Sequence, residues 1–322
     1  MNNRQRSATG LVAAVTATSL VLAIAPSASA DALDRRHQKS AASIERVTGT
    51  QDLAASSTAR GLAARSLTST DAGTVTVRVP EDTAGRVQTT APDGSTFGLA
   101  LPQDKSTRDK SVQGVRAGAG TIVYADAADS TDLAVQPTAE GGVRTLVSLK
   151  DEDAPTEQRF GLRIPAGAHL AANDSGGYDI FQDSGQGFTT LKGTISAPWA
   201  KDADGKDIAT SYKLEGDTLV QSIHTNDATA YPVVADPHYT WGIVSGTVYF
   251  NKSETRKIAL GGGLAATIIA SIPAGFTTAA GITVAAITTM ANIAQSHKKC
   301  LKIKSYGKPG EYSGKQGDGY CR

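Results

Sequence analysis

The sequence contains few of the residues on which recognisable chemistry is usually built. Its 322 residues include two cysteines, two tryptophans and five histidines, and the histidines lack the spacing of metal ligands. No Gly-x-Ser-x-Gly elbow, His-Glu-x-x-His motif or glycine-rich phosphate loop occurs. We therefore expect no cofactor and favour a non-enzymatic protein. A hydrolase with dispersed catalytic residues stays open as a third class, because triads are recognised by geometry rather than by order.

Cysteine is absent until the last part of the chain, which excludes a lipid-attachment box after a leader peptide. The two cysteines, Cys300 and Cys321, predict a disulfide if the chain is exported to an oxidising compartment. Such a bond would stabilise a small, glycine-rich segment by on the order of 3 kcal/mol.

The N-terminus has the parts of a secretory signal peptide. Two arginines precede an apolar run over residues 11–25, and the small residues 28–30 form a cleavage site. The apolar run is shorter than the ~20 residues that a membrane span needs. We expect removal of residues 1–30, a mature chain that begins near Asp31, and a secreted, extracellular protein.

Net charge is close to zero, but the two parts of the chain differ. From His238 onward there are ten basic and three acidic residues, a net charge of +7, whereas residues 31–237 carry −8. Opposite charges can steer the tail onto the acidic body or onto an anionic membrane or envelope surface. Nucleic acid is not an expected partner, because the body is acidic and the tail lacks a recognition motif.

The organisation changes twice along the chain. Residues 31–72 are polar and poor in aromatics, which predicts a disordered linker or leader. Residues 73–237 consist of short alternating runs separated by Asp-Gly and Gly-Gly turns, a pattern typical of an antiparallel β-sandwich. Residues 238–322 predict a small, cationic α+β tail with a helical hairpin and one disulfide. The predicted fold class is therefore mainly β.

A resemblance covers residues 120–237. The segments Pro198-Trp199-Ala200 and Tyr-Pro-Val-Val-Ala-Asp-Pro (residues 231–237) are similar to a β-rich module of secreted actinobacterial proteins of unassigned function. In that group a variable C-terminal part follows the module. The resemblance implies architecture and export, and it supplies no active site.

The tail contains a charge-free tract from Ile258 to Ser296. Asn251 and Glu254 have the spacing of a capping box, which predicts a helix to about residue 272. A break at 273–275 and a second helix to about residue 299 follow. The hairpin is expected to pair one stripe with another, the first formed by Leu260, Leu264, Ile268 and Ile272, the second by Ile282, Ala286, Met290 and Ile293.

Three interpretations of this tract remain open. Stable spanning is disfavoured, because the first limb would reach only ~22 Å across a hydrocarbon core of ~30 Å. A soluble hairpin would be covered by the neighbouring strand, the disulfide loop or the body. A membrane-active hairpin would use its basic flanks to adsorb to anionic lipid.

The favoured function is a secreted, non-enzymatic, precursor-like protein whose tail acts on a membrane or cell-envelope surface. Cleavage near Asp236 would release the tail. The alternative is a structural or adhesive envelope protein with the tail as a packed docking element. The predicted contact residues are Lys252, Arg256, Lys257, Leu264, Ile268, Ile272, Phe276, Lys298, Lys299, Lys302 and Lys304.

Two weaker candidates lie in the body. The carboxylates of Asp202, Asp204 and Asp207 could begin a calcium loop, but a β-turn explains the Asp-Gly pair equally well. Trp199 and Trp241 could bind a sugar or peptide. We favour packing roles for both, with Trp241 seating the tail on the body, because a buried tryptophan supplies a large contact area.

Overall fold

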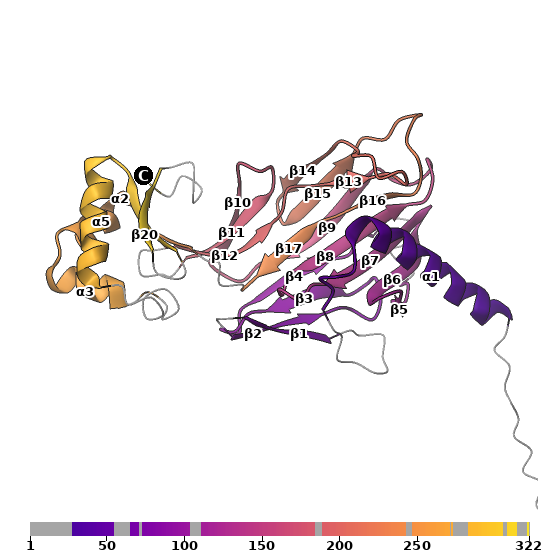
Figure 1. Ribbon diagram of the computed structural model, residues 1–322, viewed down its shortest axis with the longest axis horizontal. Coiled ribbons are helices and arrows are strands. Elements are labelled where there is room, and N and C mark those ends of the chain that lie inside the picture. The colour runs from indigo at the N-terminus through magenta and orange to yellow at the C-terminus, as the bar shows by residue number, and fades with distance from the viewer. Residues whose placement is uncertain are drawn as a thin grey trace, which may run out of the picture.

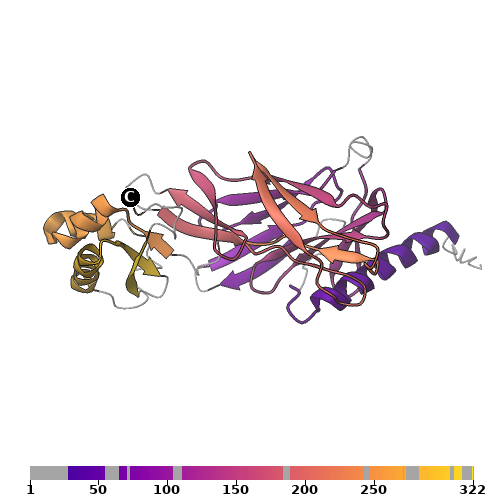
Figure 2. The same cartoon turned by 90° about the horizontal axis from the view of Figure 1, so that it is seen from above.

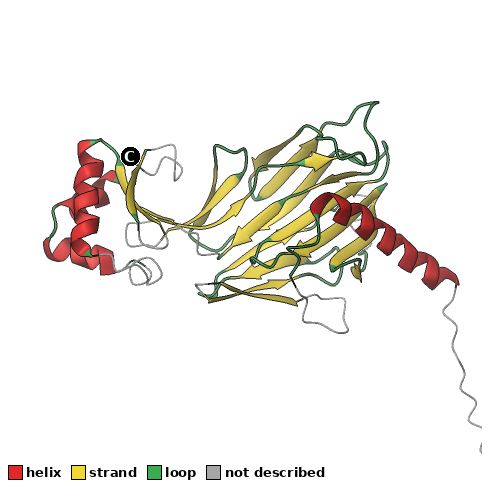
Figure 3. Cartoon of the chain, in the orientation of Figure 1, coloured by secondary structure: helices red, strands yellow, loops and turns green. Residues whose placement is uncertain are grey.

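The computed structural model describes residues 28–54, 65–70, 73–103, 111–183, 189–242, 247–270, 272, 283–304, 308–313 and 321. Most of the predicted signal peptide lies outside this range. The chain is mainly β, all of its strand pairs are antiparallel among the described residues, and a disulfide joins Cys300 to Cys321. The coarse fold prediction is confirmed (Figures 1 and 3).

Seven strands form the first sheet, in the order β1-β2-β3-β4-β9-β15-β14. Their bounds are β1 (Arg65–Thr70), β2 (Gly73–Arg78), β3 (Arg86–Thr90), β4 (Thr96–Ala100), β9 (Glu157–Arg163), β14 (Thr210–Glu215) and β15 (Thr218–Ile223). The alternating valines of residues 75–79 all point into the core, as their period of two predicts.

Thirteen strands form the second sheet. Its main path is β20-β19-β18-β12-β17-β8-β7-β6-β5, with β10 and β11 joined to β12, and β13 and β16 joined to β8. The bounds are β5 (Val115–Ala117), β6 (Thr121–Ala128), β7 (Thr131–Pro137), β8 (Val143–Leu149), β10 (Ala168–Ala172), β11 (Tyr178–Asp183), β12 (Thr189–Ile195), β13 (Ala200–Lys201), β16 (Val233–Ala235), β17 (His238–Trp241), β18 (Thr247–Tyr249), β19 (Cys300–Lys304) and β20 (Pro309–Tyr312).

One hydrophobic cluster takes side chains from both sheets. Phe97 and Phe160 come from the seven-stranded sheet, and Tyr124, Val147 and Trp241 come from the thirteen-stranded sheet. All five are fully buried. Aromatic side chains contribute large buried areas, so this shared cluster supplies the main hydrophobic stabilisation of the body.

Helix α1 (Ala28–Thr48) departs from the disordered linker predicted for residues 31–72. It lies on the outer face of the thirteen-stranded sheet (Figure 1), where Ala41 and Ile44 are fully buried beside Val123 and Leu146. The composition suggested disorder because the helix has few large apolar residues. A small residue such as Ala41 nevertheless lets the helix backbone approach the sheet closely.

Polar contacts also attach α1 to the sheet. The carboxylate of Glu45 accepts hydrogen bonds from the Ala119 N–H (2.8 Å) and the Thr121 hydroxyl (2.7 Å). Gly118 has a positive φ of 57°, and a Cβ there would lie 2.5 Å from the Glu45 oxygens. A larger residue would strain the backbone and displace the Glu45 carboxylate, so glycine is favoured at this contact.

Strand β17 belongs to the body sheet, although the tail was predicted to begin at His238. It pairs with β8 on one side and with β12 on the other. Tyr239 and Trp241 are fully buried, and Phe97 packs against both at ring distances of 4.9 and 5.8 Å. Trp241 therefore packs in the body core, as a packing role predicts, but it does not seat the tail on the body, and the module begins after this strand.

The C-terminal module contains helices α2 (Lys252–Ala259), α3 (Gly262–Ala270) and α5 (Val284–Ser296). The single helix predicted to residue 272 is wrong, because Gly261 and Gly262 both have a φ of 71° and separate α2 from α3. The predicted break at 273–275 lies outside the described residues. Figure 2 shows these helices at the end of the molecule away from α1.

Candidate functional site

The tail helices cover one face of the β18-β19-β20 strands, and each helix buries one side against this sheet. Ile258 of α2, Ile269 of α3 and Ile287 of α5 join Phe250 and Leu301 in one buried cluster. In the part of the chain that the structure describes, no helix is long and apolar enough to cross a membrane.

The predicted stripes agree with the structure at Ile272, which is buried, whereas the burial in α3 and α5 is displaced by about one residue. The structure buries Ala265 and Ile269 of α3 rather than Leu264 and Ile268, and Leu264 remains 54% exposed. In α5 it buries Ile287, Ala291 and Ala294 rather than Ala286, Met290 and Ile293. Both helices are apolar on most faces, so periodicity alone did not define which face meets the sheet. Ile282 lies outside the described residues.

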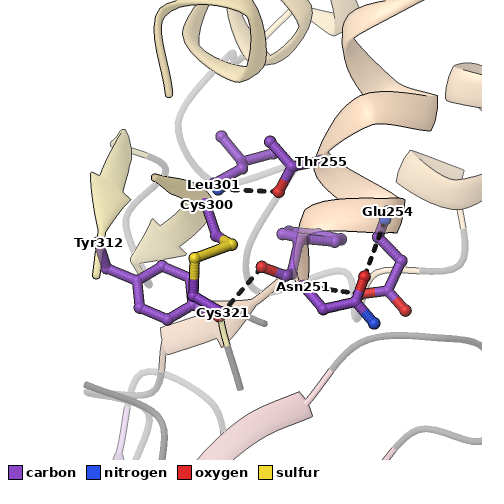
Figure 4. Close-up of a disulfide and its surroundings, with 8 residues drawn as sticks. Asn251, Glu254, Thr255, Cys300, Leu301, Tyr312 and Cys321 are labelled. Atoms are coloured by element: carbon purple, nitrogen blue, oxygen red, sulfur yellow. Dashed lines mark hydrogen bonds between the residues drawn. A yellow bond between two sulfur atoms is a disulfide. The ribbon is translucent and has the colours of Figure 1, made fainter. Parts of the chain in front are cut away.

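The start of α2 is fixed by the predicted capping box. The Asn251 side chain accepts the Glu254 N–H at 2.9 Å, and the Glu254 carboxylate accepts the Asn251 N–H at 2.8 Å. One turn later the buried Thr255 hydroxyl accepts the Leu301 N–H at 3.0 Å. These contacts, visible in Figure 4, attach the helix to β19 and set which of its faces points outward.

The disulfide lies where the module meets the body. Cys300 and Cys321 share a buried cluster with Tyr249 and Tyr312 of the module and with Phe181 of β11. The Tyr249 ring lies 5.6 Å from the Phe181 ring and 4.9 Å from the Tyr312 ring. The Tyr312 hydroxyl also donates to the Phe250 carbonyl at 3.0 Å (Figure 4). The Cys300–Cys321 disulfide therefore packs both within the module and against β11 of the body.

The outer face of α2 combines positive charge with an exposed leucine. Lys252, Arg256 and Lys257 are all exposed. Leu260, which follows Arg256 by four residues and Lys257 by three, is 78% exposed. Residues at these spacings share a helix face, so the leucine lies beside the cations. Leu264 adds a second exposed aliphatic side chain at the start of α3.

A second group of cations follows α5. Lys302 of β19 has its pKa lowered by burial and by the like charges of Lys304 and Lys299. Glu311 offsets part of this charge, because it lies 2.6 Å from Lys299 and 2.7 Å from His297. The pKa of the Glu311 carboxyl is lowered by its hydrogen bonds from Lys299 and His297. Burial is the larger cause of the lowered pKa of Lys302, and the like charges of Lys304 and Lys299 add to it.

The predicted contact residues differ in their exposure to solvent. The cations Lys252, Arg256, Lys257, Lys298 and Lys304 are exposed, and Lys299 and Lys302 are half-buried. Of the predicted apolar contacts, Leu264 is exposed, Ile268 is half-buried and Ile272 is buried in the helix–sheet cluster. Phe276 lies outside the described residues. Sequence reasoning missed Leu260 as an exposed contact because it assigned that residue to the buried stripe.

Two of the three carboxylates in the candidate calcium loop have protein partners. The Asp202 carboxylate accepts the N–H groups of Asp204 (3.0 Å) and Lys206 (2.9 Å). Asp207 pairs with Lys201 at 2.5 Å. Among the described residues, no three His, Cys, Asp or Glu side chains are grouped so that they could hold a metal ion. The geometry is that of a turn between β13 and β14.

The last residues of the 231–237 segment have a structural role that the sequence did not reveal. Asp236 is fully buried and accepts hydrogen bonds from the Trp199 N–H (3.0 Å), the Tyr212 hydroxyl (3.1 Å) and the His238 N–H (3.1 Å). Burial raises the pKa of Asp236 to about 7. Trp199 itself is half-buried against the cluster beneath α1. Asp236 therefore connects Trp199, on the side of the sheet that α1 covers, with Tyr212, which packs against the core between the two sheets.

His238 lies beside a serine, the arrangement that a dispersed hydrolase would use. The Ser196 hydroxyl is 3.0 Å from His238 Nδ1. However, burial, followed by the nearby Arg144 guanidinium, lowers the pKa of His238 to about 4. So weak a base is poorly suited to accept the serine proton near neutral pH.

We expect the His238 ring to stay neutral in the folded protein at pH 5.5. In the unfolded chain the same ring should titrate near pH ~6.5. Because the folded pKa is depressed, the stability that His238 contributes is present above the unfolded pKa and is lost as the pH falls toward 4. NMR titration of the ring carbons, folded and in urea, measures both midpoints. A folded midpoint above about 6 would contradict this prediction.

The chain matches no known protein family, no curated protein and no solved structure. The structure therefore describes the protein only as a mainly β body that carries a cationic C-terminal module with an internal disulfide.

Proposed function

We propose that this is an exported, non-enzymatic protein whose C-terminal module binds an anionic membrane or cell-envelope surface. The supporting observation is the outer face of α2, where Arg256 and Lys257 lie beside the exposed Leu260. Basic residues provide long-range attraction to an anionic surface, and an exposed aliphatic side chain adds partial insertion at the interface. Export is supported by the predicted signal peptide and by the disulfide.

In this proposal the two sheets form a sandwich that carries the module, and the tract from 258 to 296 forms a hairpin that stays packed on its sheet. The apolar residues that would insert deeply are already buried against β18 and β19. Binding would therefore be peripheral, through cations and the leucines at 260 and 264. The resemblance to secreted actinobacterial proteins remains part of the proposal.

The module is proposed to act while attached to the body. Cleavage near Asp236 would have to reach a fully buried residue. It would also transfer β17, with Tyr239 and Trp241, from the body core to the released fragment. Both effects oppose release at that position.

The alternative is an adhesive envelope protein in which the module only docks the body. Strand β12 favours this alternative, because it pairs with β17 through residues 193–195 and with β18 through residues 189–190. One strand thus belongs to both parts. In that case partner binding would reside in the body, and removal of the tail cations would leave it unchanged.

Neutralising the outer face of α2 should weaken binding to anionic vesicles. The triple variant Lys252→Gln/Arg256→Gln/Lys257→Gln loses three charges, each worth about 1 kcal/mol near such a surface, so we expect a loss of roughly 100-fold. Co-sedimentation of the mature chain with phosphatidylglycerol vesicles at low salt measures this, with phosphatidylcholine vesicles for comparison. Leu260→Ser/Leu264→Ser tests the apolar contribution separately.

A matched control removes three exposed cations from the body, Arg116→Gln/Arg163→Gln/Lys206→Gln. It should retain most of the affinity. Wild-type binding should also weaken with added salt, since exposed charges are screened over ~10 Å at 0.1 M. Absence of vesicle binding at low salt would refute the membrane proposal, and an equal loss in the control would assign binding to net charge alone.

A further inference from the structure

A second site lies in the body, between α1 and the outer face of the thirteen-stranded sheet. A cavity of about 340 Å³ opens there. Five residues of α1 form one wall, namely Arg36, Lys39, Ser40, Ser43 and Arg46. Their spacing of three to four residues places them on a single helix face. The opposite wall comes from β6, β7 and the end of β8, and the volume is at the lower end for small-molecule sites.

The acidic groups of the cavity already have protein partners. Asp126 pairs with Arg36 at 3.1 Å and with Lys150. Asp132 lies 3.3 Å from Lys150 and accepts the Asp126 N–H at 2.8 Å. The hydrogen bond from Lys150 lowers the pKa of the Asp126 carboxyl, so this carboxyl stays ionised and paired.

The uncompensated charge of the cavity is positive. Lys39 and Arg46 are exposed at its rim and have no acidic partner among the described residues. Ser40 is buried, with only 7% of the residue exposed. Its hydroxyl has no hydrogen-bond partner. An unsatisfied buried hydroxyl is costly and rare, and a ligand acceptor would satisfy it.

The backbone beside the cavity is irregular as well. Asp126 has a positive φ of 56°, and the pairing of β6 with β7 shifts register between Tyr124 and Ala128. Bulges and strained residues of this kind occur preferentially next to binding and active sites. Here the irregularity turns the Asp126 carboxylate toward Arg36 and Lys150 at the cavity.

We infer that this cavity binds a small organic anion. Lys39 and Arg46 would pair with its carboxylate or phosphate group, and the Ser40 hydroxyl, after rotation of the side chain toward the cavity, would donate a hydrogen bond to it. Ala125, Pro232 and the methylene stems of the basic side chains would contact its apolar part. The cavity is distinct from the surface of the C-terminal module and does not depend on it.

The test uses the mature chain with four probes. Benzoate and phenyl phosphate should bind, whereas their neutral counterparts benzamide and phenol should not. Isothermal titration gives the affinity, and NMR shift changes at Ser40 and Ser148, which line the cavity, give the location. Lys39→Gln/Arg46→Gln should weaken binding of both anions at least tenfold, as expected for loss of two charge-assisted contacts.

Two further variants make the result decisive. Ser40→Ala should raise thermal stability, because it removes an unsatisfied buried hydroxyl, and should still weaken anion binding several-fold. Arg163→Gln/Lys206→Gln removes the same charge from exposed positions outside the cavity and should leave binding unchanged. The inference is overturned if neither anion binds, if the neutral probes bind equally well, or if this control variant weakens binding as much as the cavity variant.

Discussion

Replacing Trp241 with alanine is expected to lower the free energy of unfolding of the body by about 3–5 kcal/mol. The side chain is fully buried and stacks on Phe97 at a ring distance of 5.8 Å. Its indole N–H also donates to the Ser95 carbonyl at 3.1 Å, so the substitution leaves a cavity and an unpaired acceptor. Urea denaturation followed by circular dichroism measures the loss.

The matched comparison is Leu264→Ala, which truncates an exposed side chain in the module and should change body stability by less than about 0.5 kcal/mol. A pair of truncations tests the same contact. A chain that ends at residue 242 retains β17 and should fold, whereas one that ends at residue 237 should not. If the shorter chain folded as well as the longer one, β17 would belong to the module.

Loss of the Cys300–Cys321 disulfide should destabilise the C-terminal module by about 3 kcal/mol. For a segment of this size, such a loss corresponds to a fall in its melting temperature of more than about 10 °C. The effect should be local, since the bond packs with Tyr249 and Tyr312 of the module. The Phe181–Tyr249 contact should loosen with it, because β18 is held between β12 and β19.

Two independent routes remove the bond. Cys300→Ala/Cys321→Ala is compared with the wild-type chain under dithiothreitol, so that an effect of the new side chains is separated from loss of the crosslink. NMR signals of Leu301 and Thr255 report on the module, and those of Phe97 report on the body. A module that melts at the same temperature with and without the bond would refute this prediction.

The body shows how far local sequence reasoning reached. Alternation and Asp-Gly turns predicted the strands of residues 73–237, because one face of each strand must meet the core. The capping box at Asn251 was also predicted correctly, since both of its partners lie within four residues. Patterns of this kind depend on neighbours along the chain.

Helix α1 was missed because its stabilising contacts are distant in sequence. Glu45 binds residues 119 and 121, and Ile44 packs on strands that lie far along the chain, from Ala117 to Val234. The cavity beside α1 was missed for the same reason. Its walls are polar residues of ordinary appearance that acquire meaning only when the helix lies on the sheet.

The candidate surface was predicted in part. The cations were identified from composition, but the exposed leucine at residue 260 was assigned to a buried stripe. In α3 and α5 most positions are small or apolar, so several helix faces were equally suitable for burial. The glycines at 261 and 262 then interrupted the helix and helped to set a different face against the sheet.

The sequence by itself determined the mainly β class, the pairing of the two cysteines and the concentration of positive charge after residue 238. These follow from composition, short-range periodicity and the presence of a single cysteine pair. The tertiary structure alone decided that β17 completes the body sheet, that a leucine beside Arg256 stays exposed and that α1 encloses a cavity. Each of these depends on which distant surfaces meet, because burial is a property of the packed chain and not of the residue.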